Sequence, residues 1–370
     1  MMIGGFYHID QVLTQSAPEK CDFKLRCDTE GRYSRKVYTN NGRTATVYAL
    51  QNGCRLTKDD VILVPDYLCV SVLNALEVSG AQFRFYRIRK DLTVDLEDLC
   101  AKMDESIRII YIIHYFGVPQ PAEVCETIRA LKKQYGAVIM EDLTQAIYTC
   151  YPGRIGYGDY IVASTRKWTP VTDGGLLAVR DGIPCDPAPL GNAYDEAAYR
   201  QLLISIYRDY YERHPEDISY YLQLEKEANA ARYLDFTPKA MTELSRRIFF
   251  QTDHERSIQK RNENYRTLWE GLQDIPGLTL LAKQPDNEGK YGPFGFPVLT
   301  EERDAFYQHL AAHGIIGEIQ WVLPLQYYTP AEDAQYLSDH NVMLQCDQRY
   351  GENEMQQVIS CIKEFFGGRK

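Results

Sequence analysis

The chain has 370 residues, of which 45% are hydrophobic and 25% charged, with a net charge of −10. This length exceeds one typical core and suits two domains, or one large domain with an appendage. The acidic balance argues against a nucleic-acid or anionic-membrane partner, and no window reaches the roughly 18 apolar residues of a membrane span.

The first half of the chain alternates helix-like and strand-like runs. Helical spacing covers residues 43–53, 67–80, 94–103 and 121–136. Apolar runs typical of strands cover residues 60–65, 82–88, 108–117, 136–142, 159–165 and 174–179. Repeated strand–helix–strand units predict an α/β fold with three layers, α/β/α, around a mostly parallel sheet. Ligands of such sheets bind at the carboxyl ends of the strands.

The rest of the chain changes character. Residues 184–235 are rich in Tyr, Glu and Arg, and we interpret them as a helical excursion in which the tyrosines serve packing or an interface. A long helical segment follows at 239–274, with further helices at 302–313 and 352–366. The runs GLTLL, FGFPVL and GIIGEIQWVL lie between them. We therefore predict a large domain over residues 1–238 and a smaller α+β domain over residues 239–370.

The ten cysteines are scattered and never form C-x-x-C. We interpret them as reduced thiols of a cytoplasmic protein, and we expect neither a disulfide framework nor a metal site. The amino-terminal MMIGGFYHID has neither a basic region nor a long apolar run, so no leader peptide is predicted.

Three features at the predicted strand ends and helix starts stand out. Glu141 and Asp142 end one strand, Ser164 and Lys167 follow the next, and Asn41–Ala45 opens a helix. Each alone has an ordinary explanation, as a salt bridge or cap, a chance spacing, and an Asn cap with a Gly turn. Together they match the needs of pyridoxal phosphate, which are phosphate donors, a carboxylate for the ring nitrogen, and a lysine that forms a Schiff base.

The order and residues of these segments resemble those of the DegT/StrS-type sugar aminotransferases, a family of fold-type-I pyridoxal-phosphate enzymes. The resemblance covers residues 41–180. It rests on NGRTAT, on VPDY, on Ile113-His114-Tyr115-Phe116-Gly117, on Glu141-Asp142-Leu143-Thr144-Gln145-Ala146, and on Arg166-Lys167-Trp168 with Thr172-Asp173-Gly174-Gly175. In the last segment the interval from the lysine to the glycines is preserved.

The resemblance implies a role for each matching residue. Lys167 would form the Schiff base and move the proton during catalysis. Asp142 would pair with the pyridine nitrogen, and Gln145 would position the cofactor near its phenolic oxygen. Tyr67 is the candidate for stacking on the ring, although Cys69 is the alternative at that position.

The resemblance assigns the phosphate to the start of the helix at residue 42. Ser164, Gly42 and the backbone N–H groups of Arg43 and Thr44 would bind it. Arg43 stands where a small hydroxyl residue is usual, and it either contacts the phosphate directly or is exposed in the first turn. Trp321 either packs in the core or stacks on a substrate.

The family's Y-N-Y-R segment before M-S-E-L is replaced here by Thr237-Pro238-Lys239-Ala240 before Met241-Thr242-Glu243-Leu244. The Asn lent across a dimer interface in that family is therefore missing. This departure places the substrate, more than the cofactor, in question.

The resemblance implies an aminotransferase that passes an amino group, from glutamate or a similar donor, to a keto-sugar that is nucleotide-linked. It also implies a homodimer. The alternatives are a lyase, a dehydratase or a desulfurase with the same cofactor, or a cofactor-binding protein without activity. The family's dehydratase has histidine in place of lysine, which argues against it here, while a desulfurase would need a reactive cysteine such as Cys69 or Cys346.

Overall fold

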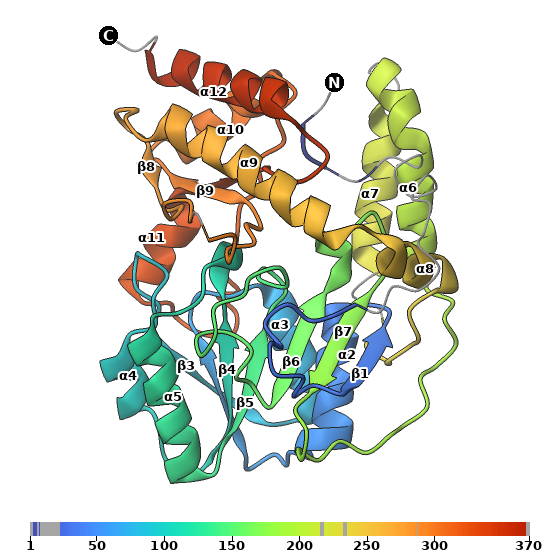
Figure 1. Ribbon diagram of the computed structural model, residues 1–370, viewed down its shortest axis with the longest axis vertical. Helices are drawn as coiled ribbons and strands as arrows, with labels where there is room; N and C mark the ends of the chain where they lie inside the picture. Colours follow the sequence, from blue (N-terminus) through green and yellow to red (C-terminus); the bar gives the residue numbers. More distant parts are fainter. Residues whose placement is uncertain are drawn as a thin grey trace.

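The protein is described by a computed structural model that covers residues 3–5, 7, 23–214, 218–231, 235–286 and 288–367, without the side chains of Asp209 and Ile218. Most of the amino-terminal stretch MMIGGFYHID, for which no leader peptide is predicted, lies outside these residues. A large sheet with helices occupies one end of the molecule, and the carboxyl-terminal elements occupy the other (Figure 1).

The large sheet carries the strands that the apolar runs predict. In the described part of the chain seven strands build it, in the order β1-β7-β6-β5-β4-β2-β3. Strands β2 to β6 are parallel, whereas β7 is antiparallel to β6 and β1 is antiparallel to β7. The bounds are β1 Arg35–Thr39, β2 Val61–Pro65, β3 Gln82–Tyr86, β4 Ile107–Ile113, β5 Val138–Asp142, β6 Tyr160–Ser164 and β7 Gly175–Val179.

Helices cover both faces of this sheet. Helix α2 (Gly42–Ala49) contacts β6, β7 and α3 (Val70–Leu76), whereas α4 (Leu96–Ala101) contacts α5 (Ala122–Tyr135). Figure 1 places α2 and α3 behind the sheet and α4 and α5 in front of it. The predicted three-layer α/β fold with a mostly parallel sheet is thereby confirmed, and parallel strands buried on two faces explain their continuous apolar sequences.

The carboxyl-terminal half differs from the prediction in three places. The helix expected over 239–274 is two helices, α8 (Glu243–Gln251) and α9 (His254–Leu272), because Asp253 caps α9 by accepting a hydrogen bond from the Arg256 N–H. The run 314–323 forms only isolated bridges. The third strand of the small sheet is instead β10 (Asn341–Leu344), which follows the unpredicted helix α11 (Glu332–His340).

The small sheet and its helices enclose a second core. The sheet has the order β10-β9-β8, with β8 at Thr279–Leu280 and β9 at Phe296–Leu299. Helices α9, α10 (Arg303–Ala312) and α12 (Glu352–Gly367) pack beside it. Helix α8 contributes Ile248 and Phe249 to the core of the large sheet. The domain boundary at 238/239 stays a prediction.

The helical excursion contains two helices that pack against each other. Helix α6 (Glu196–Arg213) and α7 (Ile218–Ala231) share a small apolar cluster of their own. Across the described ranges, no helix is both long and apolar enough to cross a membrane.

Glu141 shows how the end of β5 is fixed. Its fully buried carboxylate accepts hydrogen bonds from the N–H groups of Gly156, Tyr157 and Gly158 at 2.9, 2.9 and 2.7 Å. The same carboxylate lies 2.8 Å from His114 Nε2. A buried carboxylate is tolerated only with such partners. Glu141 therefore ties the loop after β5 to the end of β4.

Replacement of Glu141 should destabilise the fold. Glu141→Gln keeps the shape but turns an amide NH₂ group toward several donors, so the free energy of unfolding should fall by about 3 kcal/mol. Urea unfolding followed by circular dichroism measures this change. The matched Glu126→Gln on the exposed face of α5 should change stability by less than about 0.5 kcal/mol, and an equal effect of both substitutions would contradict the anchoring role.

Candidate active site

The carboxyl ends of β4, β5 and β6 open into a cavity of about 220 Å³. Most of the predicted site residues line its wall, namely Gly42, Arg43, Asp142, Gln145, Ser164, Lys167 and Trp321. Thr44 and Tyr67 are not in that wall. Residues more than 270 positions apart in the sequence are therefore brought together at the sheet edge where ligands of this fold class bind.

A second cavity, of about 490 Å³, adjoins the first. The two share Arg166, Lys167 and Asn229 in their walls. The second cavity is further lined by residues of the carboxyl-terminal part, among them Phe294, over whose ring the Lys167 ammonium lies at 5.7 Å. Lys167 thus lies at the border between the two cavities.

The backbone around Lys167 is held from several sides. Residues Thr165–Lys167 form a short 3₁₀ turn directly after β6, and the Thr165 N–H donates to the Gly174 carbonyl at 3.1 Å. The buried Trp168 indole donates to the Thr144 carbonyl at 2.9 Å. The guanidinium of Arg261 lies 4.7 Å from the Trp168 ring, within the range of a cation–π contact. The position of the lysine is consequently fixed by the loop itself.

The two glycines that end this loop are required by close packing. A Cβ at Gly174, whose φ is +141°, would lie 2.1 Å from Thr165 Oγ1. A Cβ at Gly175 would lie 2.1 Å from the carbonyl oxygen of Asn41. Only glycine allows the loop to return against the lysine turn on one side and the start of α2 on the other.

Asp142 differs from its neighbour Glu141 in its surroundings. Its buried carboxylate accepts hydrogen bonds from the Tyr111 hydroxyl at 2.8 Å and from the Thr144 N–H at 2.7 Å. Among the residues that the structure describes, no cation lies within salt-bridge distance of it. Burial, and next the charge of Asp142, raise the pKa of Tyr111 well above its usual value, which keeps the phenol protonated as a donor.

The start of α2 forms a cradle, with one correction to the prediction. The Thr44 N–H already donates to the Asn41 side chain at 3.0 Å, so Thr44 is part of the helix cap and has no N–H to offer a ligand. The amides of Gly42 and Arg43 are the earlier donors of this turn. A Cβ at Gly42 would lie 3.3 Å from Ser164 Cβ, so the glycine lets the helix start approach Ser164.

Tyr67, the predicted stacking residue, lies outside the cavity wall. It is fully buried, donates from its hydroxyl to the Gln320 carbonyl, and packs on Tyr115 and Trp321. Cys69 lines the cavity, as does the half-buried Trp321. Cys69 and Trp321 are therefore in the cavity wall, while Tyr67 packs against Trp321 outside it.

Gln145 is held between the two halves of the chain. Its Oε1 accepts the Phe116 N–H at 2.8 Å, and its Nε2 donates to Gln320 Oε1 at 2.8 Å. Gln320 in turn donates to Glu318 at 2.7 Å. Sequence reasoning missed Gln320, which no motif marks. It also missed Tyr111, whose only signal was a hydroxyl in a strand that is aliphatic apart from Arg108.

Part of the chain matches a known sequence family. Residues 29–184 match the model of the DegT/DnrJ/EryC1/StrS aminotransferase family. This range includes all of the segments on which the resemblance rested, so the resemblance is confirmed. Residues 29–184 are thus similar in sequence to this aminotransferase family.

Solved structures share the whole fold at low identity. PseC of Helicobacter pylori, an aminotransferase involved in the biosynthesis of pseudoaminic acid, is 16% identical, with full coverage of both chains and a TM-score of 0.69. DesV of S. venezuelae is 20% identical, with 92% of this chain and 86% of that chain covered and a TM-score of 0.65. DesI, solved with its TDP-sugar product, is 17% identical over 92% and 83%, with a TM-score of 0.66.

Substitution of Gly174 tests the close packing around the lysine turn. Gly174→Ala should lower the free energy of unfolding by about 3 kcal/mol, because the new methyl group combines a steric clash with an unfavourable φ. Thermal unfolding measures the loss. Gly182→Ala is the matched control, since its φ is +82° but its Cβ would meet no atom within 4 Å, and it should cost only about 1 kcal/mol. Equal losses would show that φ alone, and not packing, governs Gly174.

Proposed function

We propose that this protein is a pyridoxal-phosphate-dependent aminotransferase that moves an amino group from an amino acid to a keto-sugar. The observation that carries the proposal is Lys167 at the border of two adjoining cavities, with the buried Asp142 in the wall of the first. The family match over residues 29–184 supports the same reaction class.

The residues present fit this cofactor. The Asp142 carboxylate is buried without a described cation, and a protonated ring nitrogen would supply the missing charge. The N–H groups of Gly42 and Arg43, together with the Ser164 hydroxyl, suit a phosphate at the start of α2. Lys167 would hold the cofactor through its ε-amino group. When bound, the cofactor supplies an electron sink for the carbanion of the substrate.

The protein groups around that ring have distinct tasks. Lys167 Nζ would act as the general base toward the α-proton of the amino donor and, in the second half-reaction, as the general acid toward the corresponding carbon of the acceptor. Asp142 would keep the ring nitrogen protonated, and Tyr111 and Thr144 keep Asp142 oriented toward it. Trp321 and Cys69 border the same cavity and would restrict water around the reacting atoms.

The second cavity suits the substrates. Its wall carries hydrogen-bonding groups appropriate for sugar hydroxyls, namely Gln201, Asn229, Tyr307, Glu318 and Gln345. Arg166 lies in both walls and would bind the carboxylate of an amino donor such as glutamate. The solved complex of DesI with a TDP-sugar supports an acceptor that is linked to a nucleotide.

One observation favours an alternative reaction, that of a desulfurase. A desulfurase needs a reactive cysteine, and Cys69 lines the first cavity. Cys346 does not serve, because it is buried in the small core and burial raises the pKa of its thiol to about 12. Cys69 lies at the start of α3 and not in a mobile loop, so transamination is the better-supported reaction.

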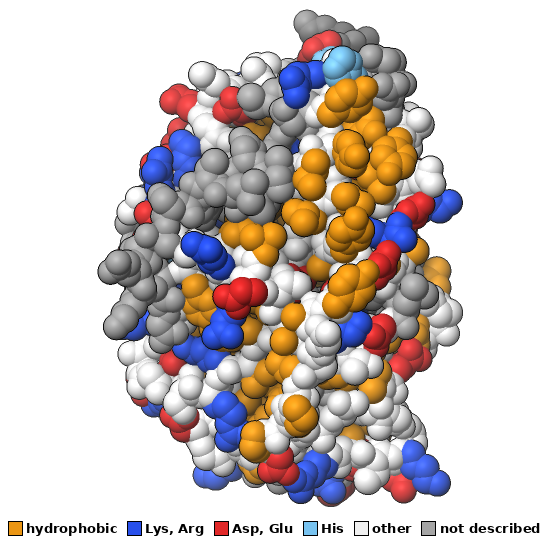
Figure 2. All heavy atoms as spheres, turned by 90° about the vertical axis from the view of Figure 1, so that its right-hand side faces the viewer, with side chains coloured by type: hydrophobic (Ala, Val, Ile, Leu, Met, Phe, Trp, Pro, Cys, Tyr) orange, Lys and Arg blue, Asp and Glu red, His pale blue; other side chains and the backbone are white. Residues whose placement is uncertain are grey.

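We also infer a homodimer in a reducing compartment, the cytoplasm. Large apolar side chains gather on the surface of α6 and α7 (Figure 2), and the exposed ones include Tyr199, Ile206, Tyr207, Tyr210, Tyr220 and Leu222. Such a patch is typical of an interface. The nine cysteines that the structure describes are all free thiols, which is consistent with reducing surroundings.

The first half-reaction can be followed by spectroscopy. Protein purified with pyridoxal phosphate should show a visible band that L-glutamate bleaches, with formation of 2-oxoglutarate in an amount equal to the bound cofactor. Lys167→Ala should lose both, because the base and the covalent attachment are removed. Lys133→Ala, an exposed lysine of α5, should behave as the wild type. A band that persists with glutamate and with other amino acids would contradict transamination, whereas a missing band in folded protein would contradict cofactor binding.

Asp142 can be tested separately from cofactor attachment. Asp142→Asn keeps the size and one acceptor oxygen for the Thr144 N–H but removes the charge, so cofactor should still bind while the rate of the glutamate half-reaction falls at least about a hundredfold. Stopped-flow absorbance measures that rate. The exposed Asp59→Asn is the control, and an undiminished rate in Asp142→Asn would exclude the proposed charge pair.

A further inference from the structure

We propose that His309, His313 and Cys361 form a zinc site that fastens α10 to α12. The three residues lie on α12 and at the carboxyl end of α10, and they line neither cavity beside Lys167. The site is therefore separate from the proposed chemistry.

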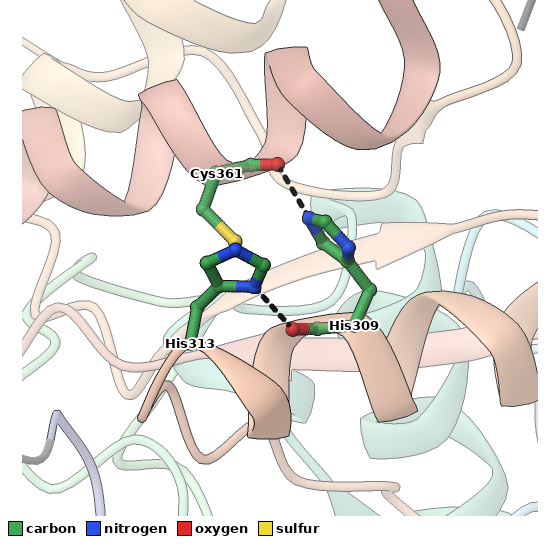
Figure 3. A group of neighbouring side chains, drawn as sticks. All are labelled: His309, His313 and Cys361. Atoms are coloured by element: carbon green, nitrogen blue, oxygen red, sulfur yellow. Dashed lines mark hydrogen bonds between the residues drawn. The ribbon is translucent and has the colours of Figure 1, made fainter. Parts of the chain in front are cut away.

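The geometry brings one nitrogen of each imidazole and the Cys361 sulfur within 4.8 Å of one another. His309 and His313 are four residues apart at the end of α10, so both face the same side of the helix. Cys361 reaches them from the neighbouring α12 (Figure 3). Ligands around a tetrahedral zinc ion are about 3.5 Å apart. Closure by about 1 Å is enough, and the exposed His313 is the side chain able to move.

The hydrogen bonds of His313 prepare it as a ligand. Its Nδ1 lies 2.8 Å from the His309 carbonyl oxygen, which places the ring proton on Nδ1 and leaves the lone pair on Nε2. Figure 3 shows this second nitrogen turned toward the sulfur of Cys361. A backbone carbonyl that orients the outer nitrogen is the usual support of a metal-binding histidine.

His309 is less directly oriented as a metal ligand than His313 is. Its Nε2 lies 3.1 Å from the Cys361 carbonyl oxygen, and its ring packs on Phe365 with the centroids 5.2 Å apart. Metal binding would replace this carbonyl contact or use the other ring nitrogen. In either case the half-buried ring stays between α10 and α12.

The donor set selects the class of metal. Two imidazoles and a thiolate favour a borderline-soft ion such as Zn²⁺ over Mg²⁺ or Ca²⁺, which prefer oxygen ligands. The Glu364 carboxylate lies 3.9 Å from His313 Nε2 and would have to turn toward the ion to serve as a fourth ligand. A site with four protein ligands is structural. Since Tyr307 of the same helix lines the second cavity, a fixed α10 would also fix one wall of that cavity.

Equilibrium dialysis of the full chain against Zn²⁺, followed by metal analysis, tests the site. The wild type should bind one ion at this site and unfold at a higher temperature with Zn²⁺ than with a chelator. Cys361→Ser and His313→Gln should each weaken binding at least about tenfold and abolish the shift in unfolding temperature. His313 is exposed, so its variant keeps the test valid if Cys361→Ser fails to fold.

Two controls separate this site from adventitious binding. His340→Gln on α11 and Cys100→Ser on α4 remove a histidine and a thiol elsewhere and should leave zinc binding unchanged. With Co²⁺ in place of Zn²⁺, a thiolate-to-metal absorption band should appear in the wild type and be absent from Cys361→Ser. No bound zinc, or equal binding by wild type, Cys361→Ser and His313→Gln, would overturn the proposal.

Discussion

The site depends on the close approach between the loop of Lys167 and the start of α2. Gly175 lies so near the Asn41 carbonyl that no side chain fits between them, and Gly174 lies equally close to Thr165. This packing fixes the lysine turn against the helix whose first residues, Gly42 and Arg43, line the cavity. The lysine and the candidate phosphate cradle are thus parts of one rigid unit, and their separation is set by backbone contacts.

The neighbouring strand divides two tasks between adjacent carboxylates. Successive residues of a strand face opposite sides, so Glu141 and Asp142 point away from each other. Glu141 is saturated by three backbone N–H groups and His114, and it stabilises the fold. Asp142 faces the cavity with two donors and no described cation, and is left available for a charged ligand. Two adjacent residues of β5 therefore serve different purposes, Glu141 for stability and Asp142 for binding.

The sequence predicts the elements that depend on local pattern. It does not predict the side-chain positions that depend on tertiary contacts. Apolar runs located the parallel strands, and the spacing from Lys167 to Gly175 located the lysine loop. Nothing local distinguishes Tyr67, which is buried, from a residue in the cavity wall. The capture of the Thr44 N–H by Asn41, and the link of Gln145 to Gln320, likewise need coordinates. Scattered cysteines predicted no metal site, since Cys361 meets His309 and His313 only after α10 and α12 pack.

The proposed function depends above all on covalent binding of the cofactor by the Lys167 amino group. The most direct measurement is reduction of the purified protein with borohydride in the presence of pyridoxal phosphate, followed by proteolysis and mass spectrometry. We expect a pyridoxyl-phosphate adduct on Lys167, and none at that position when reduction is omitted. An adduct on other lysines alone, or none in folded protein, would contradict it.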